Sequence, residues 1–181
     1  MSTILDILGA SIIGLVITLI IINLNIYSNQ VKYTSDSNLT LQGNAKTLAE
    51  IIDYDLRKIG YKYKGVAIQT AQANEISFYS DIDSSGSVKL VTLTMSDSTK
   101  ATSTSNPHDR LFYYIIGNDT SSGSLGMTNL KFSYMDSVGN ATSVISSIKY
   151  IKAETWLESP DKMGSDYEKT YWEITVSPRN I

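Results

Sequence analysis

The sequence predicts an α+β protein in which one long N-terminal α-helix packs on a C-terminal antiparallel β-sheet domain. Two observations predict this class. The chain of 181 residues begins with an almost uncharged apolar stretch, and after Gly60 the helical spacing gives way to short β-branched and aromatic runs. Because the helical and strand patterns occupy separate parts of the chain, they favour α+β over alternating α/β.

The apolar stretch at the start is long enough to cross a lipid bilayer as a helix. From Ile7 to Ile22 it reads ILGASIIGLVITLIII, with only Ser11 and Thr18 as polar interruptions. At 1.5 Å per residue, a helix over this stretch measures roughly 24 Å, or roughly 29 Å when it is counted from Ile4, close to the hydrocarbon thickness of a bilayer. We expect both hydroxyls to bond carbonyl groups of their own helix, so neither prevents burial.

Asp6 is the only charged side chain up to Gln30. Its position helps to distinguish a signal peptide, a membrane anchor and a filament-core helix. A secretory signal peptide is disfavoured, because no Lys or Arg precedes the apolar run and no small-residue cleavage site follows it. A plain membrane anchor fits the length, with Asp6 in the headgroup region. A helix held first in a membrane and later in a filament core would instead pair Asp6 with an amino terminus, since a buried carboxylate needs a partner.

The helical pattern continues well beyond the apolar stretch. We expect one helix from about Thr3 to about Ile59, loosened or bent over Tyr33–Asn38, where YTSDSN is a poor helix-forming sequence. Gly60, which follows Arg57 and Lys58 with only Ile59 between, is typical of a C-terminal cap. The second half carries an apolar stripe with steps of three and four residues, which we expect to pack on a globular domain of the same chain. The stripe consists of Leu41, Ala45, Leu48, Ile52, Leu56 and Ile59.

Beyond Gly60 we expect roughly seven strands in a β-rich globular domain. The expected strands are Glu75–Ile82, Val88–Met95, Arg110–Ile116, Leu130–Met135, Ala141–Ile145, Ile148–Leu157 and Tyr171–Val176. Ser96–Asn106 and Asn118–Gly126 are rich in Ser, Thr and Gly and are expected to be loops, and Glu158–Glu168 is expected to connect the last two strands. The chain is thus divided into a hydrophobic helix (1–32), its amphipathic continuation (33–60) and a β-rich domain (61–181).

Composition argues against several classes of function. The chain has no Cys, which removes disulfides, thiolate zinc sites and iron–sulfur clusters. Its one His, His108, precedes Asp109 in a loop without a nucleophile motif, so we interpret it as a solvated loop residue. A net charge of −3 argues against nucleic-acid binding. We therefore expect no enzymatic activity and no cofactor, and we interpret the 12 tyrosines as strand and interface residues.

One turn resembles the first half of a calcium-binding loop. Asp81, Asp83 and Ser85 occupy ligand positions 1, 3 and 5, and Gly86 occupies position 6. Position 12, where such loops carry a bidentate Glu, is Thr92. We therefore interpret this segment as an Asx-rich hairpin turn, with a calcium site at Asp81, Asp83 and Ser85 as the alternative.

Three stretches together resemble a known family. In Ser2–Asp6, Asp6 becomes the fifth residue if the initiator Met is removed; Leu48–Tyr61 contains Asp-Leu-Arg and ends in Gly-Tyr; and Ile76–Gly86 is a strand followed by an acidic turn. These features resemble the type IV pilin superfamily, which includes pseudopilins and carries an acidic fifth residue, usually Glu. The chain departs from that pattern in having no basic leader ending in Gly and no helix-kinking proline, Asn23 and Asn25 occupying that zone.

The resemblance implies a subunit of an extracellular, pilus-like filament on a bacterial surface, of the kind involved in cell adhesion. It implies copies of the same chain as the main partner, the inner membrane before assembly, and minor pilins and an assembly ATPase machinery as further partners. Asp6 would set the registration of the helices. The expected core seam consists of Ile7, Ile12, Ile13, Leu15, Val16, Leu19 and Ile20. Two alternatives stay open: a minor pilin or pseudopilin of a type IV pilus or type II secretion machine, and a single-span membrane-anchored binding module.

Overall fold

The computed structural model describes residues 2–96, 101–102 and 104–181, and it divides the chain into two compact units, Met1–Leu39 and Thr40–Ile181. Helix α1 (Ser2–Arg57) begins in the first unit and ends in the second. The division falls within the segment 33–60 that we expected to form the amphipathic continuation. Part of the expected loop Ser96–Asn106, namely residues 97–100 and 103, lies outside the described residues.

Helix α1 is regular where the sequence predicted a weak point. Residues 33–38 are helical throughout, so the expected loosening or bend over Tyr33–Asn38 is wrong. The Thr34 hydroxyl is satisfied within the helix, because it donates to the Gln30 carbonyl at 2.9 Å. Extending an existing helix adds one backbone hydrogen bond for each residue that is fixed. This gain outweighs the modest cost of a low helix propensity.

The helix ends at Arg57, two residues before the expected Ile59, because its last turn tightens. Lys58 N–H bonds the Asp55 carbonyl and Ile59 N–H bonds the Leu56 carbonyl, both three residues back. Gly60 then takes a left-handed conformation with φ of 75°, as a residue that terminates a helix does.

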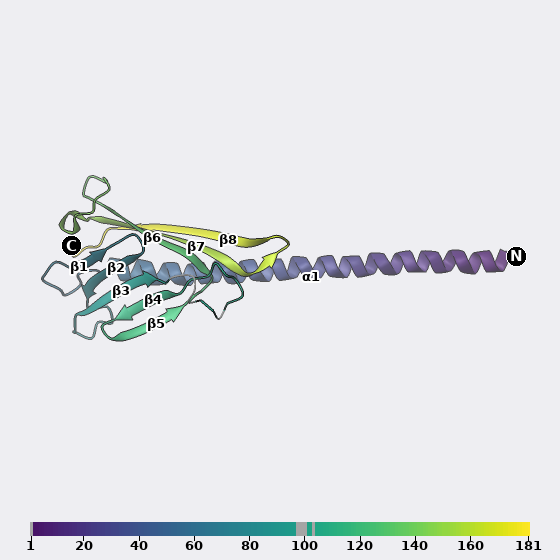
Figure 1. The fold of residues 1–181 in the computed structure, drawn as a ribbon, viewed down its shortest axis with the longest axis horizontal. Coiled ribbons are helices and arrows are strands. Elements are labelled where there is room, and N and C mark those ends of the chain that lie inside the picture. The colour runs from purple at the N-terminus through teal and green to yellow at the C-terminus, as the bar shows by residue number, and fades with distance from the viewer. Residues whose placement is uncertain (1, 97–100, 103) are drawn as a thin grey trace. The chain divides into compact units, whose positions relative to one another are not determined.

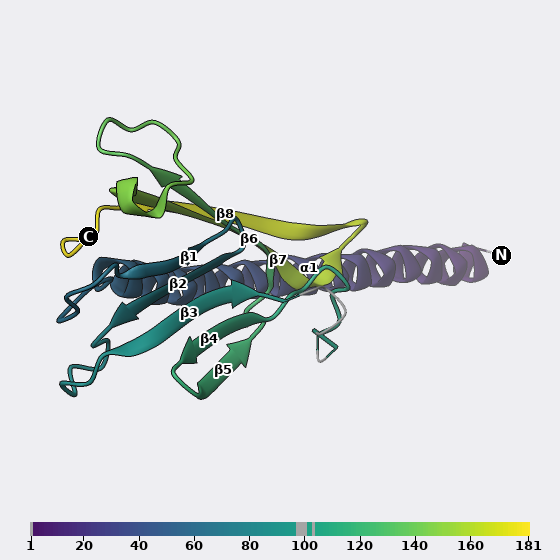
Figure 2. The same cartoon turned by 60° about the vertical axis from the view of Figure 1, so that its left-hand side comes forward.

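The rest of the second unit forms two antiparallel sheets (Figures 1 and 2). The first sheet is a meander in chain order: β1 (Ile68–Ala71), β2 (Glu75–Ser80), β3 (Lys89–Met95), β4 (Phe112–Ile116) and β5 (Asp119–Gly123). The second sheet holds β6 (Met127–Met135), β7 (Tyr150–Met163) and β8 (Asp166–Val176). A helix packed on purely antiparallel sheets confirms the predicted α+β class.

Two segments adopt structures that the sequence did not predict. Asn118–Gly126 is not a loop, because β5 folds back on β4 through a turn at Gly117, whose φ is 60°. Ala141–Ile145 is not a strand: Ala141 makes a single bridge to Met135, and a 3₁₀-helix follows at Ile145–Ser147. The Ser- and Gly-rich composition of β5 indicated a loop, but its pairing with β4 decides its conformation.

The remaining strand boundaries also differ from the expectation. Glu158–Glu168 is not a separate connection, because β7 and β8 extend through it and turn at Gly164, with φ of 71°. The short strand β1 was not predicted, and it pairs with β2 across an irregular register. These extensions lengthen the β7–β8 hairpin, whose pairing is interrupted between Glu158 and Lys162.

The core forms around the second half of α1. Leu48, Ile52, Leu56 and Ile59 are fully buried and share one cluster with Phe78 of the first sheet, and with buried side chains of both sheets. Leu41 and Ala45 pack in a smaller cluster with Leu157 of β7. The predicted apolar stripe is therefore the face that both sheets contact, and burial of these side chains stabilises the second unit.

Candidate functional site

The first unit exposes the side chains that we expected to form a core seam. All seven lie on α1 with between 50 and 67% of their surface exposed: Ile7, Ile12, Ile13, Leu15, Val16, Leu19 and Ile20. A continuous apolar surface of this kind costs free energy in water, roughly 25 cal/mol for each Å² left exposed. Such surfaces mark contacts with lipid or with other protein chains.

Within the described part of the chain, α1 is the helix long and apolar enough to cross a membrane. Its most apolar window of 18 residues has a mean hydropathy of 2.6. Signal sequences near an N-terminus and buried core helices pass the same test of length and composition.

The polar side chains inside the apolar stretch are satisfied within the helix. The Ser11 hydroxyl donates to the Ile7 carbonyl and the Thr18 hydroxyl to the Gly14 carbonyl, both at 2.8 Å, as we expected. Further along, the Asn25 amide donates to the Ile21 carbonyl at 3.0 Å. The Ser11 and Thr18 hydroxyl donors therefore need no water or partner when the helix surface becomes covered.

Asp6 lies just beyond the first turn of α1, with its side chain exposed. An interaction with the helix dipole falls off within the first turn. The positive end of the helix therefore stabilises this carboxylate less than it would stabilise one at the N-cap. If the surrounding apolar surface becomes buried, Asp6 needs a cationic partner.

The residues of the candidate calcium loop are already engaged by lysines. Asp81 is fully buried, and its Oδ2 accepts from Lys62 Nζ at 2.6 Å and from the Gly86 N–H at 3.0 Å. Asp83 Oδ1 accepts from the Ser85 N–H at 3.1 Å, and its Oδ2 accepts from Lys89 Nζ at 3.0 Å.

This arrangement is that of an Asx-rich hairpin turn. Hydrogen bonds from Ser85, and then from Lys89, hold the pKa of Asp83 well below its usual range. Lys62 and Lys89 each occupy one oxygen of these carboxylates, Asp81 Oδ2 and Asp83 Oδ2, and would compete with a calcium ion for it. Among the described residues, no group of three or more His, Asp and Glu side chains is placed to hold a metal ion.

His108 is not merely a solvated loop residue, although 58% of its side chain is exposed. Its Nδ1 lies 2.8 Å from Glu158 Oε2, and its ring stacks edge-on with Tyr167 of β8. Asn106 donates to the same Glu158 oxygen at 3.2 Å. These contacts fasten the 104–109 segment to β7. Sequence reasoning missed them because His108 and Glu158 are 50 residues apart.

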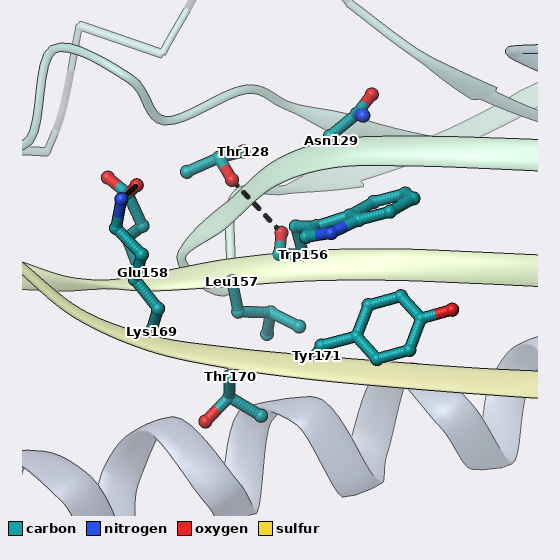
Figure 3. A pocket seen from close by; sticks show the side chains of 8 residues that line it. All are labelled: Thr128, Asn129, Trp156, Leu157, Glu158, Lys169, Thr170 and Tyr171. Carbon is teal, nitrogen blue, oxygen red and sulfur yellow. Dashed lines mark hydrogen bonds and ion pairs between the residues drawn. The ribbon is translucent and has the colours of Figure 1, made fainter.

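A second feature missed by sequence reasoning lies on the outer face of the second sheet. Trp156 pairs with Tyr171 across β7 and β8, and Glu158 pairs with Lys169 two positions further along. Between these pairs lies a cavity of about 380 Å³ (Figure 3). Its lining residues are Thr128, Asn129, Trp156, Leu157, Glu158, Lys169, Thr170 and Tyr171. The signal for it was the alternation along β7, which places Glu154, Trp156 and Glu158 on one face.

Comparison of the chain with protein families, with curated proteins and with solved structures finds no match. The described residues present two candidate functional features, the exposed apolar segment of α1 and the outer face of the β6–β7–β8 sheet.

Proposed function

We propose that this protein is a non-enzymatic structural subunit of an extracellular, pilus-like filament that polymerises through the first unit of α1. The observation that carries the proposal is the exposed apolar surface of that unit, in which each residue of the expected seam keeps at least half of its surface exposed. Copies of the chain would cover this surface by packing their helices together, because apolar burial is the dominant driving force for association.

Asp6 gives the proposed filament its registration. In a bundle of apolar helices the carboxylate is removed from water, so it is stable only beside a cation. The amino terminus of its own or of a neighbouring chain would supply that cation. Each helix then has one axial position at which its charge is neutralised, and head-to-tail repetition without closure gives a helical polymer.

The same segment would hold the subunit in the inner membrane before assembly. Its apolar stretch matches the bilayer in length, and its hydroxyl groups bond within the helix. The resemblance to type IV pilins supports this order of events, and it adds minor pilins and an assembly ATPase machinery as proposed partners. A minor pilin or pseudopilin would use the same segment at a filament tip or in a secretion machine.

A second candidate function is a single-span membrane-anchored binding module. The specific observation in its favour is the lined cavity on the outer face of the second sheet (Figure 3). In this function α1 would stay in lipid as a monomer, with Asp6 in the headgroup region, where a carboxylate costs little.

Negative-stain electron microscopy of the purified full chain separates these functions. Long uniform fibres are expected for a filament subunit, whereas monodisperse particles would exclude a bulk polymer. The test of Asp6 is Asp6→Ala, which we expect to reduce filament yield strongly because the buried amino terminus loses its counter-ion.

Glu50→Ala is the matched control for Asp6→Ala. It removes one carboxylate from the same helix, where Glu50 is 68% exposed and paired loosely with Lys46. The control is expected to assemble as the unmodified chain does, because an exposed ion pair contributes little. Normal filament yield from Asp6→Ala would show that Asp6 does not register the helices.

A further inference from the structure

We propose that the outer face of the β6–β7–β8 sheet carries a binding site for a neutral saccharide, in the cavity lined by Trp156, Tyr171, Glu158 and Lys169. This inference is independent of polymerisation. The cavity of about 380 Å³ falls within the size range of small-molecule sites, and it is bordered by aromatic surface and by a few polar groups, as such sites are.

The strand register builds the cavity from two rows of side chains. One row is Asn129, Trp156 and Tyr171, and the other is Glu158 and Lys169, on the same face of the sheet. Residues two positions apart on a strand lie roughly 6.6 Å apart and point the same way. The space for a ligand is the cavity of about 380 Å³ that these rows line.

The aromatic row is held in place before any ligand arrives. The rings of Trp156 and Tyr171 lie 5.1 Å apart with a tilt of 52°. The Tyr171 hydroxyl lies 2.9 Å from Glu154 Oε1 and also within hydrogen-bond reach of Glu173 Oε2, and its single proton is donated to one of these carboxylates at a time. Lys152 pairs with both of these carboxylates, at 3.3 and 2.8 Å. A wall fixed in this way loses little side-chain entropy on binding.

The Glu158 side chain of the charged row is held by residues of the 104–109 segment. Glu158 is largely buried, and its Oε2 is engaged by His108 and Asn106. Its other oxygen, Oε1, lies 3.5 Å from Lys169 Nζ. The Lys169 side chain is 72% exposed, so its ammonium group keeps donors free for a ligand. Figure 3 shows Glu158 and Lys169 close together, with Trp156 and Tyr171 further along the strands.

The balance of groups selects the class of ligand. An anion in the cavity would face Glu158, and a cation would face Lys169, so either would be disfavoured at one end. A hydroxyl group both donates and accepts, which matches the carboxylate, the ammonium and the exposed Asn129 amide together. The apolar face of a pyranose ring matches the rings of Trp156 and Tyr171. A neutral hexopyranose therefore satisfies both rows.

The test is saturation-transfer difference NMR on the full chain in a zwitterionic detergent, since alkyl-glycoside detergents carry the same chemistry as the ligand. The probes are D-glucose, D-galactose, D-mannose and N-acetyl-D-glucosamine, titrated to about 50 mM to reach weak millimolar affinities. We expect a saturable signal from at least one probe. A saturable signal from none of them would overturn the proposal.

The variants locate the site. Trp156→Ala and Lys169→Met are each expected to weaken binding by at least about tenfold, a loss of one significant contact. Lys169→Met is expected to leave the fold intact, because this side chain is mostly exposed. A loss of binding in this variant therefore does not reflect misfolding. Trp172→Phe is the control, since Trp172 alternates with Tyr171 along β8 and belongs to the other face. Unchanged binding in both test variants would overturn the site.

A negatively charged sugar tests whether the site prefers neutral ligands. N-acetylneuraminic acid carries a carboxylate, so we expect it to bind more weakly than the best neutral probe. Preferential binding of this acid would overturn the assignment to neutral saccharides. Filament yield is scored separately on the same variants, so that loss of sugar binding with normal fibres, or the converse, distinguishes this site from the proposed assembly function.

Discussion

Asp55 illustrates how a single residue on α1 responds to the tertiary fold. It is 2% exposed, and its Oδ2 is buried without a hydrogen-bond partner among the described residues. Burial raises the pKa of this carboxyl from 3.8 to about 7, although the Tyr114 hydroxyl and Lys58 oppose the change. The folded protein therefore favours the protonated form of Asp55.

This pKa predicts a pH-dependent stability. Because the folded pKa lies above the unfolded value, the protonated carboxyl stabilises the fold fully below about pH 4, and this stabilisation is lost as the pH rises through 7. We expect Asp55→Asn to remove most of that dependence, by at most about 4 kcal/mol between pH 4 and pH 8. Urea unfolding followed by circular dichroism across this range measures it.

Asp53→Asn provides the control for the pH experiment. Asp53 lies on the same helix but pairs at the surface with Arg57, so its loss is expected to change stability by about 0.5 kcal/mol or less, with little effect on the pH dependence. An Asp55→Asn protein whose stability still falls with pH as in the unmodified chain would contradict the assignment.

At the scale of the element, the end of α1 depends on Gly60. Its φ of 75° is a conformation that L side chains rarely adopt, and a Cβ there would overlap the backbone carbonyl of Asn180. Asn180 in the C-terminal segment therefore leaves no space for a methyl group at this position.

We therefore expect Gly60→Ala to lower the free energy of unfolding by about 2–4 kcal/mol, from backbone strain together with the clash. Gly86→Ala is a matched control, because Gly86 also has a positive φ, of 89°, but open space around its Cβ position. It is expected to lose only about 1 kcal/mol. Equal losses in the two variants, measured by urea unfolding, would show that the contact with Asn180 is unimportant.

The elements differ in how far local sequence predicts them. The helical stripe from Leu41 to Ile59 was predictable, because every member follows the 3.6-residue period and faces the core. The strand β5 was not, because its sequence DTSSG has little strand propensity and pairs with β4 through tertiary context. Likewise, nothing local distinguishes Ala141–Ile145 from a strand.

At the scale of the whole molecule, the two units make different demands on their surroundings. The first unit exposes its apolar side chains, whereas buried apolar residues begin at Leu41 in the second. The second unit therefore has a core of its own, built from the second half of α1, from Ile59 just after it, and from both sheets.

We accordingly predict that a chain beginning at Thr40 is soluble, monomeric and cooperatively folded, while the full chain requires detergent, lipid or self-association. Size-exclusion chromatography and thermal unfolding by circular dichroism test this. The full chain serves as the reference, with its apolar surface retained. Aggregation or non-cooperative unfolding of the shortened chain would show that the first unit contributes to the core.

The exposed apolar segment, its single carboxylate and the amphipathic stripe could be derived from sequence because each rests on periodicity and composition within neighbouring turns of one helix. The candidate saccharide site could not, because its rows exist only through the register of β6, β7 and β8. The same holds for the contact between His108 and Glu158, which are 50 residues apart. Contacts within a helix repeat every few residues, so local sequence predicts them. Strand pairing joins residues that are distant in the sequence, and its register depends on the packing of the whole domain.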